Sequence, residues 1–387
     1  MISGLGFGGA ESQLMLLSAE LARRGHEVIL YLLTDHAPRA EQLAGAGVEV
    51  IVDRKRMRID PGVLWRLRQL VRYRRPDVVH GYLFDGNWYA CVACIGLGVP
   101  VLCAERSSDY KLSRAQWLGH RAVRRFVSGV VANSERGRLQ ARDLFGVADR
   151  HAHVVWNGLD LPSIDRRLRA CHRDHRHAIF GAADIRLLVV VGSLYDAKDQ
   201  LLAVQAFAQL LELDPSWRLL LVGASFADRV VYDDTHAVAQ ATAYEQSVRG
   251  QIAALGLENH VRLTGQRQDA LEIIGDADVL LSTSKREGSP NVVLEAMAAG
   301  TPVVATDFSD IRRLLPNDWQ VVGDRDPQTL ARAVLRAHGQ REQLAAEQRG
   351  WIEAHATIGI AVDTLVEIYR GYAPKGSCGG SQAAVQP

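Results

Sequence analysis

The sequence lacks the features that mark three large classes of protein. Its 45 Lys and Arg residues nearly balance its 44 Asp and Glu residues, and a formal net charge of +1 argues against a dedicated nucleic-acid binder. Five scattered cysteines argue against a disulfide framework and favour reduced thiols. The most apolar stretch, residues 89–104, is interrupted by Gly96, Gly98 and Pro100 and is too short for a membrane span. We therefore expect a cytoplasmic protein without a membrane-spanning segment.

The composition is that of a globular protein, 48% hydrophobic and 23% charged, and a length of 387 residues favours two domains. Strand-like apolar runs alternate with helix-like segments in two series, which a polar stretch rich in His and Arg separates. This pattern predicts two doubly wound, Rossmann-like α/β domains over residues 1–162 and 185–351, with a hinge over 163–184. Such sheets bind ligands beyond the carboxyl ends of their strands, so we expect a cleft between facing domains. Residues 373–387 are rich in Gly, Ser, Ala and Gln and are expected to be disordered.

Only Met1, Ile2 and Ser3 precede the first glycine-rich loop, at the place where a doubly wound domain has its central strand. A parallel sheet without that strand would be damaged, so we expect the protein's true start to lie upstream. A longer expressed chain that is no more soluble would contradict this expectation. The first residues also lack the basic segment of a secretory signal peptide.

The segment over residues 287–302 is the most informative part of the sequence. It follows an apolar, strand-like run and is expected to open a helix with Ser289 as N-cap and Pro290 as the first helical residue. Glu287 then lies in the loop before the helix, and Glu295 lies nearly two turns inside it. Free N–H groups at a helix start attract phosphate, and carboxylates accept hydrogen bonds from hydroxyl groups. The segment therefore predicts a site for a sugar nucleotide.

This segment resembles the Glu-x7-Glu signature of the retaining glycosyltransferases of group 1, family 4, which have the GT-B fold. The resemblance runs on to Asp307 and covers nearly the whole chain. It implies two facing Rossmann-like domains and a last helix, residues 352–372, that crosses back to the first domain. It also implies front-face departure of the nucleoside diphosphate, with Glu295 on the ribose and Glu287 at the donor sugar and the reacting face.

Other segments resemble the donor-binding loops of that family. The glycine loop with Gly8 and Gly9 would lie against the phosphate and sugar of the donor, and the segment with Gly265 and Arg267 would meet the nucleobase. The start of the signature segment would contribute further donor contacts through Gly288, Ser289, Pro290 and Asn291.

The loop at the start of the second domain departs from the family pattern. Lys198 matches the lysine that holds the donor diphosphate, but Ser193 stands where the family has an arginine. A diphosphate calls for more than one cation, and serine cannot reproduce the fork of a guanidinium. We expect Arg286 or Arg267 to supply the missing charge.

In the first domain, the family's active-site histidine follows a strand after a Gly-x-Pro turn. The corresponding stretch here contains no histidine, and Glu105 or Arg106 occupies its neighbourhood. These two residues are therefore the catalytic candidates of the first domain. His80 ends a strand and either faces the acceptor or packs in the core.

Residues 54–75 carry nine basic residues against one acidic residue, with Trp65 and several aliphatic residues interleaved. Two interpretations stay open. The segment could contact a membrane that bears anionic lipids, or it could be a solvated helix whose arginines cover apolar surface with their stems.

No metal or other cofactor is expected. Cys91 and Cys94 lie in an apolar helix and are expected to pack in the core, and Asp276 and Asp278 flank the start of a buried strand. The sequence therefore predicts a metal-independent glycosyltransferase that uses a UDP- or GDP-linked sugar and a glycan or lipid-linked acceptor, in the assembly of a bacterial surface polysaccharide, lipopolysaccharide or glycolipid. The alternative is a GT-B-shaped protein that binds sugar nucleotides but has weak or no catalysis, which Ser193 and the absent histidine favour.

Overall fold

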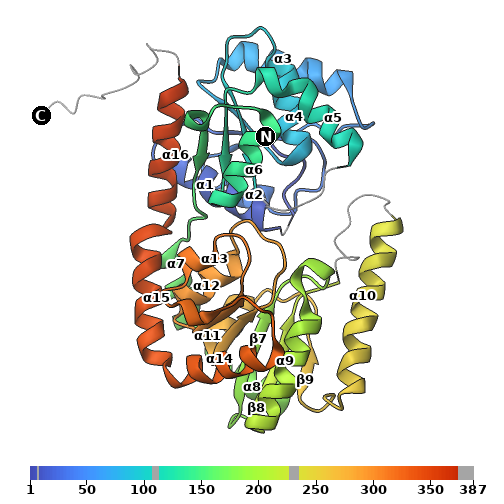
Figure 1. Cartoon of the computed structure of the whole chain (residues 1–387). Coiled ribbons are helices and arrows are strands. Elements are labelled where there is room, and N and C mark those ends of the chain that lie inside the picture. The colour runs from blue at the N-terminus through green and yellow to red at the C-terminus, as the bar shows by residue number, and fades with distance from the viewer. Residues whose placement is uncertain (7, 107–112, 226–234, 374–387) are drawn as a thin grey trace, which may run out of the picture. The chain divides into compact units, whose positions relative to one another are not determined.

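The computed structural model describes residues 1–6, 8–106, 113–225 and 235–373 (Figure 1). The chain divides into two compact units. The first contains Met1–Gly158 and the chain from Ile358 onward, and the second contains Leu159–Thr357. Within the described residues, no helix is long and apolar enough to cross a bilayer.

The first unit has a four-stranded parallel sheet in the order β3-β4-β5-β6 and a parallel pair, β1-β2. Met1 and Ile2 connect the two: Ile2 forms a parallel bridge with Leu32 of β1, and the amide of Tyr82 in β3 donates to the carbonyl of Met1 over 2.8 Å. The strands are β1 Ile29–Leu32, β2 Glu49–Val52, β3 Val79–Tyr82, β4 Val101–Glu105, β5 Gly129–Ala132 and β6 Ala152–Val154.

Helices pack against this sheet through their buried apolar side chains, which form a core with those of the strands. Cys91 and Cys94 are buried in that core, as the sequence predicts. The last helix of the chain packs against the first, and Arg24 donates to Asp363 over 2.5 Å. The helices are α1 Gly9–Arg23, α2 Ala40–Ala44, α3 Pro61–Arg74, α4 Leu83–Cys94, α5 Arg114–Val123, α6 Glu135–Phe145 and α16 Ile358–Tyr372, with short 3-10 turns at Arg124–Phe126 and Asp149–His151.

The second unit has one six-stranded parallel sheet in the order β12-β11-β10-β7-β8-β9. If the strands of the unit are numbered from one to six and the sheet is read from β9, the order is 3-2-1-4-5-6, that of a Rossmann fold. The order in which the chain adds strands reverses between β7 and β10, while all strands stay parallel. The strands are β7 Arg186–Val191, β8 Trp217–Val222, β9 Val261–Leu263, β10 Val279–Ser282, β11 Val303–Thr306 and β12 Val321–Val322. β10, β11 and β12 are buried throughout, and so are most residues of β7 and β8, which is why these strands read as apolar runs.

The helices of the second unit include α7 and α8, which lie where the sequence predicts a hinge. The helices of this unit are α7 Leu161–Ala170, α8 His175–Phe180, α9 Gln200–Leu213, α10 Thr235–Ala254, α11 Ala270–Asp276, α12 Asn291–Ala299, α13 Ile311–Leu314, α14 Pro327–Gly339 and α15 Arg341–His355, with 3-10 turns at Asp196–Lys198 and Asp318–Gln320. In Figure 1, α10 lies beside α9, and α15 lies near α12.

Residues 163–184, where a hinge between the domains is expected, do not form a linker. They hold most of α7 and all of α8, and both helices belong to the second unit. Asp160 accepts from the amide of Ser163 and caps α7, while Arg167 pairs with Glu272 of α11 at 2.8 Å. The His- and Arg-rich composition thus reflects helix caps and ion pairs. The expected single helix over 352–372 is also interrupted, because α15 ends at His355 and α16 begins at Ile358.

Candidate functional site

The best candidate site lies at the reversal point of the second sheet. β7 and β10 are neighbours and run parallel, so the loops that follow them leave the same edge of the sheet. In doubly wound sheets, this crevice beyond the carboxyl ends of the strands is where ligands bind. The loop after β7 carries Lys198, and the loop after β10 carries Glu287.

The structure brings these two predicted residues together. The Lys198 ammonium donates a short hydrogen bond to Oε1 of Glu287, and the Ser284 hydroxyl donates to the same oxygen over 2.8 Å. The Lys198 side chain is 19% exposed and the Glu287 side chain 14%. A cation and a carboxylate are therefore held side by side, and both side chains are mostly buried but remain partly exposed to solvent.

The helix of the signature begins later than the sequence suggests. α12 starts at Asn291, and Pro290 is its N-cap, with an extended ψ of 100° and no side-chain capping bond. The expectation that Ser289 caps the helix and Pro290 is its first residue is therefore wrong. The carbonyl of Pro290 accepts from the amides of Val293 and Leu294, so the first turn closes on the proline. Gly288 and Ser289 remain in the loop that leads into the helix.

Glu295 is the fifth residue of α12, a little over one turn inside the helix. Its neighbours Leu294 and Ala296 are fully buried, and Glu295 itself is half-buried. Burial raises the pKa of its carboxyl to about 7, against which the positive charge of Arg167 acts only weakly. Among the described residues, its carboxylate has no hydrogen-bond partner. A carboxyl group that lacks a protein partner is suited to accept hydrogen bonds from ligand hydroxyls.

Further cations surround the Lys198–Glu287 pair. Lys285 donates to Asp196 over 2.7 Å, whereas Arg286 approaches Asp196 only to 3.8 Å. Arg325, in the loop after β12, donates to Asp199 over 2.7 Å. Sequence reasoning misses Arg325, because its loop carries no motif and its contacts lie 41 to 126 residues away in the chain.

Ser193 and Gly265 also lie on loops at this edge of the second sheet. The carbonyl of Ser193 accepts from the side-chain amide of Gln200 over 2.9 Å, and the serine is 8% exposed. Gly265 has a φ of +67°, which favours glycine, and its carbonyl accepts from the amide of Gly223 over 2.9 Å. A Cβ on Gly223 would lie 2.0 Å from the carbonyl oxygen of Gly192, so the loops after β7 and β8 touch through glycines.

Arg267 is held by a carboxylate of its own segment. Its guanidinium donates to both oxygens of Asp269 over 2.7 and 2.6 Å, and this bond lowers the pKa of Asp269 to about 2. A cation that a bidentate partner already neutralises is a poorer candidate for a diphosphate than Arg286.

The candidates of the first unit lie at the start of α1 and at the end of β4. Gly8 is the N-cap of α1 and Gly9 its first residue. A Cβ on Gly8 would lie 2.1 Å from a carboxylate oxygen of Glu11, so the Glu11 side chain would have to move if a larger residue stood there.

Glu105 and Arg106 lie at the end of β4, and both are buried. Arg106 donates to the side-chain oxygen of Asn157 over 2.6 Å, and burial lowers the pKa of its guanidinium. His80 contacts the hydroxyl of Tyr369 in α16, with 2.7 Å between Nδ1 and the oxygen. His80 thus has a packing role within the first unit.

The basic segment over residues 54–75 forms the loop before α3 and α3 itself. Part of its charge is paired within the first unit: Arg66 with Asp53 at 2.6 Å and Arg74 with Glu49 at 2.5 Å. Of the nine cations of this segment, all of them described, four make no side-chain ion pair or hydrogen bond: Arg56, Arg58, Arg72 and Arg75. The large apolar side chains that the segment exposes are Met57, Ile59, Trp65 and Tyr73.

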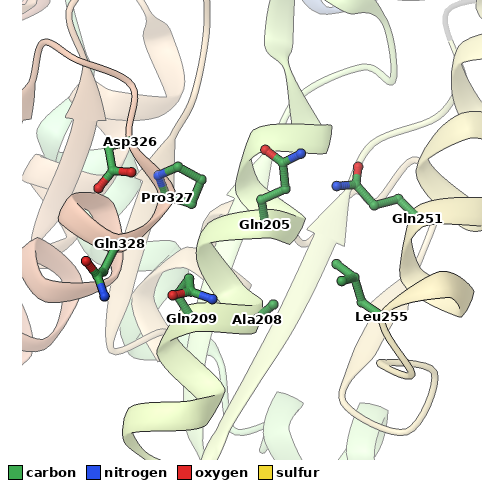
Figure 2. Close-up of a pocket in the computed structure, with 8 residues that line it drawn as sticks. All are labelled: Gln205, Ala208, Gln209, Gln251, Leu255, Asp326, Pro327 and Gln328. Carbon is green, nitrogen blue, oxygen red and sulfur yellow. The ribbon is translucent and has the colours of Figure 1, made fainter.

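A groove of about 460 Å³ lies on another part of the second unit, over α9, α10 and α14. Figure 2 shows Gln205 and Gln209 of α9 between Gln251 of α10 and Gln328 of α14. None of the site residues that the sequence predicts lines this groove. It is therefore distinct from the site at the edge of the sheet.

Comparisons with known proteins agree with this organisation. Residues 7–162 match the family described as Glycosyltransferase Family 4, and residues 185–340 match the family described as Glycosyl transferases group 1. The chain is 26% identical to the D-inositol 3-phosphate glycosyltransferase of Thermomonospora curvata, over 98% of this chain and 94% of that protein. It is also 26% identical to the phosphatidyl-myo-inositol mannosyltransferase of Mycobacterium tuberculosis, over 80% of this chain and 76% of that protein.

Two solved structures show the same fold. The Anabaena protein Alr3699/HepE in complex with UDP and glucose has a TM-score of 0.78 at 19% identity, with 96% of this chain and 99% of that chain covered. A glycosyltransferase from Rickettsia africae has a TM-score of 0.77 at 14% identity, with 96% and 97% covered. These similarities confirm the expected pair of Rossmann-like α/β domains.

Proposed function

Because the chain belongs to the group 1, family 4 glycosyltransferases and has their GT-B fold, we propose that it moves a sugar from a nucleotide-sugar donor to a glycan or lipid-linked acceptor with retention of configuration. The donor is UDP- or GDP-linked, and the complexes of HepE with UDP and with UDP-glucose support UDP. The product belongs to a bacterial surface polysaccharide, lipopolysaccharide or glycolipid. Transfer needs no divalent metal, so a chelator should leave the rate unchanged.

The Lys198–Glu287 pair at the reversal point of the second sheet carries this proposal. In the proposed reaction the bond between the donor sugar and the diphosphate breaks, and negative charge develops on the leaving phosphate. A bond forms between the anomeric carbon and the acceptor hydroxyl oxygen, and the proton of that hydroxyl passes to the leaving phosphate. Lys198 stabilises that charge, and Glu287 contacts the donor sugar at the reacting face. Glu295 accepts hydrogen bonds from the ribose. On the first unit, Glu105 and Arg106 are the proposed contributors, in place of the histidine that the family carries.

Transfer and donor-hydrolysis assays with UDP-, GDP- and ADP-sugars test the proposal directly. Lys198→Ala and Glu287→Ala should each lower turnover by about 100-fold, the usual loss for one group that stabilises transition-state charge. Glu295→Ala should abolish donor binding, and the exposed Glu258→Ala in the same unit serves as the matched control. Donor affinity that survives in Glu295→Ala would overturn the assignment of the donor site.

Arg286 is the proposed second cation for the diphosphate, and Arg267 is the second choice. Arg286→Ala should weaken UDP binding, whereas Arg267→Ala should weaken it less because Asp269 already holds that guanidinium. Calorimetric titration with UDP separates the two. If neither variant changes the affinity, the missing charge does not come from these residues.

A sugar-nucleotide-binding protein without turnover is the second candidate function. Ser193 in place of an arginine and the absence of a histidine after β4 favour it. Binding of a nucleotide sugar without transfer or hydrolysis, for every donor and acceptor in the panel, would decide for this alternative.

We also propose that residues 54–75 contact anionic lipid at the inner face of the membrane. The four cations without partners and the exposed Trp65 and Tyr73 support this. Flotation with vesicles of phosphatidylcholine and phosphatidylglycerol at low salt is the test. Binding should decrease in an Arg56→Ala/Arg72→Ala variant and persist in Arg312→Ala, and a wild-type protein that does not float ends the proposal.

A further inference from the structure

Arg325 joins three parts of the second unit through one guanidinium. Its Nη2 donates to Oδ2 of Asp199 over 2.7 Å and to the carbonyl of Thr283 over 2.8 Å. Its Nη1 donates to the carbonyl of Ser284 over 3.1 Å. The loop after β12 is thereby tied both to the loop after β7 and to the loop after β10.

Those two loops are also tied directly to each other. The hydroxyl of Thr283 lies 3.0 Å from the carbonyl oxygen of Lys198 and 2.9 Å from that of Asp199. The amide of Lys285 donates to the carbonyl of Ala197 over 2.8 Å. The backbone on either side of Lys198 is thus bonded to the backbone that leads to Glu287.

The backbone of both members of the Arg325–Asp199 pair is unusual. Arg325 has a φ of +55° and Asp199 a φ of +49°, and they are two of the five non-glycine residues with positive φ in the described part of the chain. Residues with side chains rarely adopt this conformation, and it persists only where surrounding contacts fix it. The ion pair therefore holds two strained loop positions in place.

We propose that Arg325 is a positioning residue, which fixes Lys198 and Glu287 relative to each other before the donor binds. The proposal rests on the proposed function, since it concerns the same donor site. Arg325 acts through the loops and not on the donor, because three of its hydrogen bonds already end on protein oxygens. A planar guanidinium spans these three acceptors in a way that a lysine ammonium does not.

Two substitutions of Arg325 separate the guanidinium from the backbone. Arg325→Gly accepts the positive φ without strain, so a loss in that variant does not come from a strained backbone. We expect UDP to bind about tenfold more weakly, as for one lost charge-assisted hydrogen bond. Arg325→Lys should not restore the affinity. Arg312→Ala, which removes an exposed ion pair with Asp307 in the same unit, is the matched control.

A double-mutant cycle tests whether Arg325 acts through Lys198. In a Lys198→Ala background, Arg325→Gly should change the UDP affinity by less than about twofold, because the residue that it positions is already gone. Full additivity of the two substitutions would overturn the proposal. So would wild-type affinity in Arg325→Gly.

A measurement without nucleotide separates this inference from the proposed function. In the ligand-free Arg325→Gly variant, the Lys285 amide should exchange its hydrogen faster than in the wild type, while amides in β8 keep their rates. If the wild type binds no nucleoside diphosphate but the Lys285 amide responds as expected, the proposed function fails and the positioning role stands. If the wild type binds UDP and the exchange of Lys285 is unchanged in the variant, the positioning role fails alone.

Discussion

The raised pKa of Glu295 predicts that the second unit becomes less stable as the pH rises. Burial moves the pKa of this carboxyl from its ordinary value of 4.5 to about 7. Between these two values the folded protein binds more protons than the unfolded chain, so the free energy of unfolding decreases with increasing pH. Below pH 4.5 the carboxyl is protonated in both states and does not lower the free energy of unfolding. Above pH 7 it is ionised in both states, and the full cost of a buried carboxylate lowers the free energy of unfolding.

The size of the effect follows from the shift. A change of one pKa unit corresponds to about 1.4 kcal/mol, so the rise from 4.5 to about 7 makes the cost at pH 8 about 3 kcal/mol, and most of it develops between pH 5 and pH 8. Glu295→Gln keeps the shape of the side chain and cannot ionise. The stability of this variant relative to the wild type should therefore rise by about 2–3 kcal/mol from pH 5 to pH 8.

Hydrogen exchange is the suitable assay, because a two-unit protein need not unfold in one step. The slowest amides of β7 and β10 report the opening free energy of the second unit alone, after correction for intrinsic exchange rates. Glu258→Gln, an exposed carboxylate of the same unit, is the control and should show no such trend. A stability difference between Glu295→Gln and the wild type that is equal at pH 5 and pH 8 would refute the reasoning.

Three further predictions concern stability and the placement of the loops. Gly223→Ala should destabilise the second unit by more than about 1 kcal/mol and weaken UDP binding, since its Cβ would lie 2.0 Å from the Gly192 carbonyl at a φ of +152°; thermal unfolding and UDP titration measure this. Asp60→Ala removes the cap of α3 and should cost about 1 kcal/mol in chemical denaturation. Asn157→Ala takes away an acceptor of the buried Arg106 and should cost about 2 kcal/mol in the same assay, with no loss if that hydrogen bond is dispensable.

Much of the fold is predictable because parallel strands are buried on both faces. The apolar, strand-like runs that predict two doubly wound domains are strands in the structure, as β7, Arg186–Val191, and β8, Trp217–Val222, show in the second unit. Residues 163–184 could not be assigned in this way, because α7 and α8 bury few residues and depend on caps and on ion pairs with distant residues.

The site shows the same division between local and distant information. Lys198 and Glu287 are predictable, since each lies in a motif at the end of a strand, and parallel strands bring such ends together. The start of α12 was misplaced because serine is typical of the N-cap and proline of the first helical position, whereas the backbone angles make Pro290 the N-cap. Arg325 has no local signal at all: only the folded chain places it against Asp199.

The charge balance of the site explains why the serine at position 193 matters. The loops over residues 192–199 and 283–290 carry three cations, Lys198, Lys285 and Arg286, and three carboxylates, Asp196, Asp199 and Glu287. These loops are therefore neutral as a pair, and Arg325 adds a single positive charge that Asp199 holds. An arginine in place of Ser193 would have added a second. A diphosphate must then bind the cation that the protein holds most weakly. Arg286 lies 3.8 Å from the carboxylate of Asp196, whereas Lys285 lies 2.7 Å from it. Arg286 therefore exchanges its carboxylate for a phosphate at the lowest electrostatic cost.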